Sequence, residues 1–152
     1  MIEIVAFRKE FTTHFYELNL EWLETYFYVE DFDREVLSNP QKYIIDPGGF
    51  IFFAVENEQV LGTVALMKHS DRVFELTKMA VLPNQRGRKI GQRLLTHCID
   101  FGRQMNFEAL ILYSNRKLEN AIHIYRKHGF EEIPVEANSP YVRSNIKMKL
   151  TY

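Results

Sequence analysis

The sequence lacks several features that mark particular classes of protein. It holds one cysteine, Cys98, which excludes an internal disulfide and any zinc or iron–sulfur site built from several cysteines. Its seven glycines and five prolines are too few, in 152 residues, for a collagen-like or low-complexity chain. No segment approaches the roughly 20 apolar residues of a membrane span, and the charged start MIEIVAFRKEF is unlike a signal peptide. We therefore expect a cytoplasmic protein without a membrane partner.

What is present is the composition of an ordinary folded domain. Hydrophobic residues make up 46% of the chain and charged residues 26%. Aromatic residues reach 14%, which argues against intrinsic disorder because disordered chains contain few of them. We expect residues 1–152 to form a single domain, since this length is enough to bury a core without disulfides or metals.

Charge is nearly balanced overall but unevenly distributed along the chain. The net charge of −1 argues against nucleic-acid binding. Residues 1–40 hold nine acidic and three basic residues, whereas residues 83–130 hold three acidic and nine basic residues. This asymmetry indicates an anionic ligand held by the second half and a cationic partner near the first, with clustering on solvated faces as the alternative.

The hydrophobic pattern predicts an alternation of helices and strands. Asn39-Pro40 is expected to end the second helix. The element order is βααβββαβαββ, which predicts a mixed α/β sheet with helices on both faces. Three consecutive strands require antiparallel pairing, so a doubly wound dinucleotide fold is excluded. The expected strands are 2–7, 50–55, 60–67, 73–82, 109–113, 131–135 and 145–150, and the expected helices are 10–26, 30–37, 89–105 and 116–128.

The loop QRGRKIG, at residues 85–91, joins the third consecutive strand to the next helix. Unpaired N–H groups and the helix dipole make a helix N-terminus an anion site. Gly87 and Gly91 would let a phosphate approach the backbone closely. Neither the ATP-type P-loop pattern nor Gly-x-Gly-x-x-Gly is present, so the loop is expected to hold a pyrophosphate that is not cleaved there. A plain strand-to-helix turn with surface charges is the alternative. Positive charge would come from Arg86, Arg88 and Lys89.

Two further segments accompany this loop: ELTKMAV at residues 75–81 and NAIHIYRKHGF at residues 120–130. Together with the loop they resemble the GNAT superfamily of acyl-CoA-dependent N-acyltransferases. The resemblance is strong over residues 50–133 and covers the first 40 residues only in helix placement. It departs at Lys89, where the superfamily usually has glycine. We expect a side chain there to be compatible with helical geometry.

The resemblance implies where the donor, acetyl-CoA, would bind. The strand at residues 76–82 would carry a bulge and splay from the strand at residues 109–113, with the donor between them. The Met79 N–H would bind the thioester carbonyl as an oxyanion donor, and Asn120 would hydrogen-bond the pantetheine. The pantetheine would pair with the main chain of Met79, Ala80 and Val81. The pyrophosphate would lie on the N–H groups of Arg86, Gly87, Arg88, Lys89, Ile90 and Gly91.

The implied reaction is the attack of an amine on a thioester, and it needs a base because an ammonium cannot attack. Glu75 is the candidate base, directly or through a water. A strand carboxylate paired with Lys78 or Arg72 is the alternative. Tyr125 matches the superfamily's usual acid for the thiolate leaving group, and a core tyrosine is the alternative. We expect no metal, because the histidines do not have metal-ligand spacing.

The superfamily builds its acceptor site from the first helical region, which here is rich in aromatic residues, with ordinary core packing as the alternative. The acidic residues beside it, Glu30, Asp31 and Asp33, suit a cationic amine, with a solvated acidic face as the alternative. Arg143 in the later tail suits a substrate carboxylate. The two arguments conflict, and both stay open. The candidate acceptor residues are Tyr26, Tyr28, Tyr141 and Arg143.

We therefore expect an N-acetyltransferase that moves an acetyl group from acetyl-CoA to the primary amine of a small-molecule or amino-acid-like acceptor, by direct attack in a ternary complex. A protein lysine or N-terminal acetyltransferase is the alternative within the enzyme class. A non-catalytic acyl-CoA-binding regulator is the alternative outside it. Many members of the superfamily dimerise, and the resemblance leaves a homodimer open.

Overall fold

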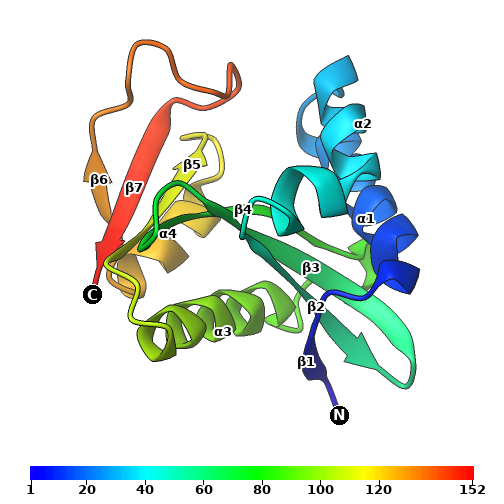
Figure 1. The fold of residues 1–152 in the computed structure, drawn as a ribbon. Coiled ribbons are helices and arrows are strands. Elements are labelled where there is room, and N and C mark those ends of the chain that lie inside the picture. Colours follow the sequence, from blue (N-terminus) through cyan, green and yellow to red (C-terminus); the bar gives the residue numbers. More distant parts are fainter.

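A mixed sheet of seven strands runs through the computed structural model of the chain, in the order β1-β2-β3-β4-β5-β7-β6 (Figure 1). All neighbours pair antiparallel except β4 and β5, which pair parallel. The expected mixed α/β architecture is therefore confirmed. The strands are β1 Glu3–Ala6, β2 Phe50–Glu56, β3 Gln59–Lys68, β4 Val73–Val81, β5 Ala109–Ser114, β6 Glu131–Ile133 and β7 Ile146–Thr151.

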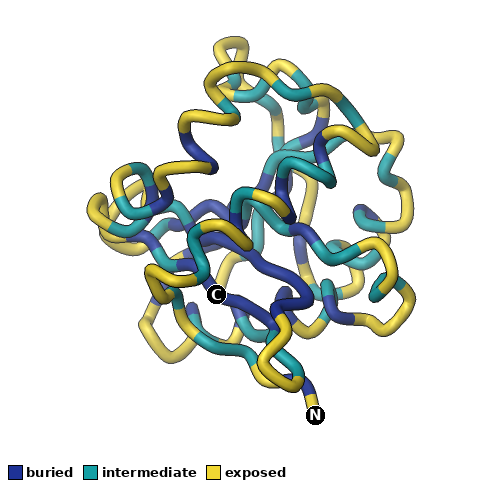
Figure 2. The backbone as a smooth tube through the Cα atoms, turned by 90° about the vertical axis from the view of Figure 1, so that its right-hand side faces the viewer, coloured by how far each residue is buried: buried dark blue, intermediate teal, exposed yellow.

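Helices cover both faces of the sheet, as expected (Figure 1). Helices α1 (Thr12–Tyr26) and α2 (Asp31–Ser38) lie on one face, and α3 (Ile90–Gln104) and α4 (Glu119–Lys127) lie on the other. Two hydrophobic clusters follow from this arrangement. In β2, Phe53 packs toward α1 while its neighbour Phe52 packs toward α3, since successive strand residues point to opposite faces. Figure 2 shows the buried stretches running through the middle of the molecule.

The region after α2 differs from the expectation. Pro40 follows the end of α2, but it also precedes a further helical turn, the π-helix Gln41–Ile45. A proline is well tolerated at the start of a helical turn, because its missing N–H has no partner there in any case. Ile44 from this turn is buried in the cluster under α1, so apolar packing explains why the chain turns again.

Helix α4 begins at Glu119, three residues later than expected. The side chain of Asn145 accepts a hydrogen bond from the backbone N–H of Arg116, at 2.8 Å. The side chain of Asn115 accepts one from the backbone N–H of Lys117, at 2.9 Å. These side-chain acceptors compete with helical hydrogen bonds and hold residues 116–118 in a turn.

The register between β3 and β4 contains the feature that shapes the site. Ala65 lies opposite Thr77, and Thr63 lies opposite Ala80, so Val64 faces two residues of β4, Lys78 and Met79. This is a β-bulge, and Lys78 takes a φ of 56° within it.

Strands β4 and β5 pair only over their first three residues, from the pair Val73–Ala109 to the pair Glu75–Ile111. Beyond Glu75 the two strands separate. The expected bulge and splay are both confirmed. None of the helices combines the length and the apolar character needed to cross a bilayer.

Candidate active site

A cavity of about 780 Å³ lies where β4 and β5 separate. One side of it, here called the donor wall, consists of the β4 bulge, the loop at residues 85–91 and helix α4. The opposite side, here called the acceptor wall, comes from α1, α2 and the loop at residues 134–145. Its polar members are Asn19, Tyr26, Asp33, Tyr141 and Arg143.

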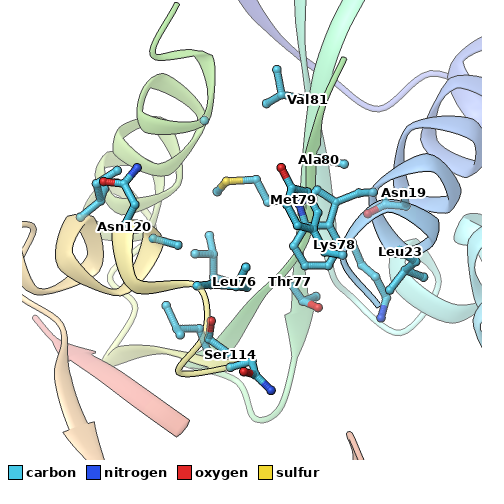
Figure 3. A pocket seen from close by; sticks show the side chains of 18 of the residues that line it. Asn19, Leu23, Leu76, Thr77, Lys78, Met79, Ala80, Val81, Ser114 and Asn120 are labelled. Atoms are coloured by element: carbon cyan, nitrogen blue, oxygen red, sulfur yellow. The ribbon is translucent and has the colours of Figure 1, made fainter. Parts of the chain in front are cut away.

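The bulge contributes its backbone and two side chains to the cavity. Met79 and Lys78 leave it in opposite directions, Met79 toward Asn120 of α4 and Lys78 toward Leu23 of α1 (Figure 3). The backbone of β4 beyond Glu75 has no strand partner on the β5 side. An extended ligand can therefore pair with this stretch as an added strand would.

The loop before α3 has the geometry of an anion site. Gly87 has a φ of 97°, and no atom lies within 4 Å of the place where a Cβ would stand. A Cβ on Gly91 would lie 3.7 Å from the sulfur of Met79, so the loop faces the bulge directly. Helix α3 begins at Ile90, and the unpaired N–H groups of its first turn adjoin the cavity.

Lys89 corrects one expectation. It is the residue before α3, with φ 60° and ψ 27°, which is the left-handed region and not helical geometry. A side chain in this region meets steric strain that glycine avoids. The usual glycine of the superfamily therefore has a conformational reason, and Lys89 carries the strain in this chain.

The two arginines of the loop have different surroundings. Arg86 lines the cavity, where its guanidinium donates to Glu21 at 2.8 Å. Arg88 donates to both carboxylate oxygens of Glu56, at 3.0 and 3.1 Å, and does not line the cavity. Arg88 is the one proposed donor-site residue whose side chain the structure directs elsewhere.

Tyr125 and Asn120 reach the cavity from α4. The Tyr125 hydroxyl makes no hydrogen bond to another residue, and burial raises its pKa to about 12. A core tyrosine normally has a satisfied hydroxyl, whereas this one is free and faces the cavity. A tyrosine with a raised pKa keeps its proton at neutral pH and can donate it.

Glu75 is close to the cavity without lining it. Its carboxylate is only 3% exposed and accepts hydrogen bonds from the Tyr141 hydroxyl at 2.5 Å and from His69 Nε2 at 2.8 Å. Neither alternative partner holds it: Lys78 forms no ion pair with it, and Arg72 donates to the carbonyl of Asn106. Tyr141 thus lies between Glu75 and the cavity.

His69 lies on the outer side of Glu75, and its side chain is 38% exposed. Its hydrogen bond with Glu75 raises the pKa of the imidazole, while partial burial opposes this shift. Burial is also the main reason for the raised pKa of Tyr141. Tyr141, Glu75 and His69 therefore form a continuous hydrogen-bonded path from the cavity toward solvent.

An acidic and a basic residue of the acceptor wall bind each other, which resolves the conflict between the two predictions of the acceptor's charge. Both guanidinium NH2 groups of Arg143 donate to Asp33, each at 2.9 Å, in a bidentate ion pair. Burial is the largest single influence and would raise the pKa of Asp33, but the hydrogen bonds from Arg143 and the backbone of Glu30, together with the positive charges of Arg143 and Lys78, hold that pKa below its usual value. Each group therefore neutralises the other. Tyr28 does not line the cavity; its ring lies 5.7 Å from the Arg143 guanidinium carbon.

Lys78 is the functional candidate that the sequence pattern did not single out. Strict alternation along β4 would place it on the same face as Phe74 and Leu76, which pack toward α3. The bulge reverses this alternation and turns Lys78 toward α1 (Figure 3). The sequence carries no direct signal for a bulge at this position. No three His, Cys, Asp or Glu side chains gather closely enough to hold a metal.

Comparison with known proteins places this arrangement in a family. Residues 12–130 match the family described as "Acetyltransferase (GNAT) family". The chain belongs to the GNAT family. The GNAT resemblance expected from the three sequence segments is therefore confirmed.

Individual relatives agree with this placement. An aminoalkylphosphonate N-acetyltransferase from Salmonella typhimurium is 30% identical over 94 residues, which are 59% of this chain and 61% of that protein. The chain thus aligns with less than two thirds of this curated relative.

Solved structures show the same fold over the whole chain. A GNAT-family acetyltransferase from Staphylococcus aureus has a TM-score of 0.87 at 22% identity and covers 99% of both chains. The PaiA N-acetyltransferase from Thermoplasma acidophilum, in complex with coenzyme A, has a TM-score of 0.77 at 19% identity, covering 100% of this chain and 99% of that one.

The left-handed backbone at Lys89 predicts an unusual order of stability among variants. We expect Lys89→Gly to be more stable than Lys89→Ala by about 1 kcal/mol, because glycine accepts positive φ without strain. Urea denaturation of both variants measures this difference. Glu24, an exposed residue inside α1, is the matched control, where alanine should be the more stable replacement by about 1 kcal/mol. Equal stability of the two Lys89 variants would contradict the assigned backbone conformation.

Proposed function

We propose that the chain is an acetyl-CoA-dependent N-acetyltransferase that acts on the primary amine of a small-molecule acceptor. The observation that carries this proposal is the cavity between the separated strands β4 and β5, with an anion-binding loop on its donor wall. The family match supports it. The coenzyme A complex of a protein with the same fold supports the choice of donor.

The donor's parts match features of the donor wall. The pyrophosphate would lie on the N–H groups of residues 86–91, at the start of α3. The pantetheine would pair with the free backbone edge of Met79, Ala80 and Val81, and Asn120 would hydrogen-bond it from α4. The Met79 N–H would donate to the thioester oxygen as negative charge develops there.

The cavity holds groups that could supply and take up the protons of the acetyl transfer. The amine nitrogen attacks the thioester carbonyl carbon, the C–S bond breaks, and coenzyme A leaves as a thiolate. Tyr125 would give its proton to this thiolate, because its hydroxyl is free and protonated at neutral pH. The attacking nitrogen loses a proton as the amide forms, and this proton would restore the Tyr125 hydroxyl. The ammonium form of the acceptor must lose one further proton before the attack.

Glu75 would receive that proton through Tyr141. Since Glu75 does not line the cavity, direct contact with the amine is excluded in this conformation. Tyr141 can accept a proton from the amine while it passes its own to Glu75, to which it already donates at 2.5 Å. His69 then links Glu75 to the solvent side.

The small-molecule acceptor is supported by the charged and aromatic side chains of the acceptor wall. The name of the Salmonella relative identifies a small aminoalkyl compound as its acceptor. A protein lysine or N-terminal acceptor and a non-catalytic acyl-CoA-binding role are the alternatives that the experiments below separate.

Acetyl-CoA should raise the melting temperature of the protein. A ligand that binds only the folded state at 100 times its dissociation constant adds about 2.7 kcal/mol of stability, which is several degrees for a domain of this size. Gly91→Glu should abolish the shift, since it places a carboxylate at the anion site. Release of free thiol with a panel of small amines then tests turnover. No shift with folded protein would contradict the donor assignment. A shift without turnover of any small amine would contradict the small-molecule acceptor and favour a protein acceptor or the regulator.

Tyr125→Phe should lower kcat by roughly 10- to 100-fold with little change in KM, because proton donation to the thiolate occurs only in the transition state. Steady-state thiol release measures both constants, and calorimetry checks that acetyl-CoA affinity is retained. An unchanged kcat would make Tyr125 a packing residue only.

Tyr141→Phe and Glu75→Gln should each lower kcat by roughly 10- to 100-fold at neutral pH. The deficit should shrink as pH rises toward the acceptor's own pKa, since more acceptor is then already deprotonated. Tyr43 and Glu35 form a matched pair outside the cavity, with a hydroxyl-to-carboxylate hydrogen bond of 3.0 Å. Tyr43→Phe and Glu35→Gln should leave the pH profile unchanged. A deficit that does not vary with pH would contradict the proton path.

A further inference from the structure

Lys78 brings a positive charge into the acceptor side of the cavity. The bulge gives this residue a φ of 56° and directs its side chain toward α1 (Figure 3). Its side chain lines the cavity together with Asp33, Tyr141 and Arg143. The ammonium lies 5.1 Å from the centre of the Tyr141 ring, so the hydroxyl that contacts Glu75 and the lysine share one corner of the cavity.

The ammonium of Lys78 has no hydrogen-bond or ion-pair partner in the protein. The two nearby carboxylates are already occupied. Asp33 accepts from both guanidinium NH2 groups of Arg143 and from the backbone of Glu30. Glu75 accepts from Tyr141 and His69. The three donors of Lys78 therefore remain available to a ligand in the cavity.

The surroundings favour an anionic ligand at this position. Burial lowers the pKa of Lys78 and the positive charge of Arg143 lowers it further, while the negative charges of Glu75 and Asp33 oppose this change. A charged donor in a partly desolvated site interacts more strongly with an opposite charge than it would in water. Arg143 is less suited to this role, because its bidentate ion pair with Asp33 already balances its charge. Lys78, and not Arg143, is thus the cation of the acceptor side without an ion-pair partner.

The position of Lys78 also limits the size of the acceptor. Its Cα is about 3.8 Å from that of Met79, the proposed oxyanion donor, because the two residues are adjacent in the chain. Because the ammonium ends the flexible four-carbon side chain of Lys78, the anion site and the reacting thioester would be separated by about the reach of one lysine side chain. An acceptor that uses both must carry its amine and its acidic group a few bonds from each other.

We propose that Lys78 binds the acidic group of the acceptor, so that the enzyme selects small amines that carry a carboxylate or phosphonate. This inference rests on the proposed acetyltransferase function and adds the chemical class of the acceptor to it. Lys78 is then a specificity-determining residue. Its contribution should appear with acidic acceptors and be absent with neutral acceptors of similar chain length.

Matched pairs of amines test the proposal. The panel contains glycine, β-alanine and aminoethylphosphonate, each beside a neutral partner (glycinamide, β-alaninamide and propylamine), with a diamine as a cationic probe. We expect the wild-type protein to prefer the acidic member of each pair in kcat/KM. Lys78→Met should lower kcat/KM for acidic acceptors by roughly 10- to 100-fold, mainly through KM, which is the range for loss of one charge-assisted hydrogen bond. Neutral acceptors should change by less than about twofold, and Lys78→Arg should recover part of the loss.

The control variant is Lys42→Met. Lys42 is exposed and lies 5.1 Å from the ring centre of Tyr43, the same distance that separates Lys78 from Tyr141, but outside the cavity. It should not alter the preference for acidic acceptors. Far-UV circular dichroism and melting temperature confirm that each variant is folded, and calorimetry with acetyl-CoA confirms that the donor site is intact.

The outcomes separate the two proposals. The role of Lys78 is overturned if Lys78→Met leaves unchanged the ratio of kcat/KM for acidic acceptors to kcat/KM for neutral acceptors. A wild-type preference for neutral amines or the diamine overturns it as well. Acetyl-CoA binding without turnover of any acidic amine also overturns it, while the donor site stands. Failure of the wild-type protein to bind acetyl-CoA overturns the proposed function itself.

Discussion

The bulge at Lys78 and Met79 is the constraint on which the rest of the site depends. One extra residue in β4 reverses the alternation of side chains along the strand, so that Met79 turns toward α4 and Lys78 toward α1. Strand β4 also separates from β5 beyond Glu75, which leaves a backbone edge unpaired in the middle of a sheet. An unpaired edge at this depth needs a partner, and an extended ligand supplies one. The same backbone irregularity thus creates the cavity and assigns its two sides.

The fold was predictable from the sequence because its signals are local and repeated. The run of apolar residues in β2 specifies a strand that is buried on both faces, where Phe52 and Phe53 enter different clusters. The loop at residues 85–91 was recognisable from glycines and charges at the start of a helix. Its backbone was harder to predict, since nothing in the letters shows that Lys89 takes a left-handed conformation.

Contacts between distant segments were beyond the reach of sequence patterns. Asp33 and Arg143 suggested opposite acceptor charges when each was considered alone, yet they bind each other across 110 positions of the chain. Glu75 and Tyr141, 66 positions apart, could not be paired from their spacing either. Residue type identifies a candidate group, but its protonation and availability depend on partners that only the fold brings together. This is why Lys78, the cation without a partner, emerged from the structure alone.

Protonation of Lys78 and binding of an acidic acceptor should depend on each other. Burial lowers the pKa of Lys78, so taking an anion into the cavity stabilises the charged form and raises that pKa again. By linkage, the interaction free energy that raises the pKa of Lys78 also strengthens binding of the anion. In the proposed reaction the acceptor's amine would need the opposite change, since it would lose its proton next to Tyr141 and Glu75. The acceptor side would therefore keep one proton on Lys78, which binds the acidic group, and take another from the amine that reacts. Lys78 and the Tyr141–Glu75 pair would perform these two tasks side by side, because the bulge turns Lys78 toward that pair.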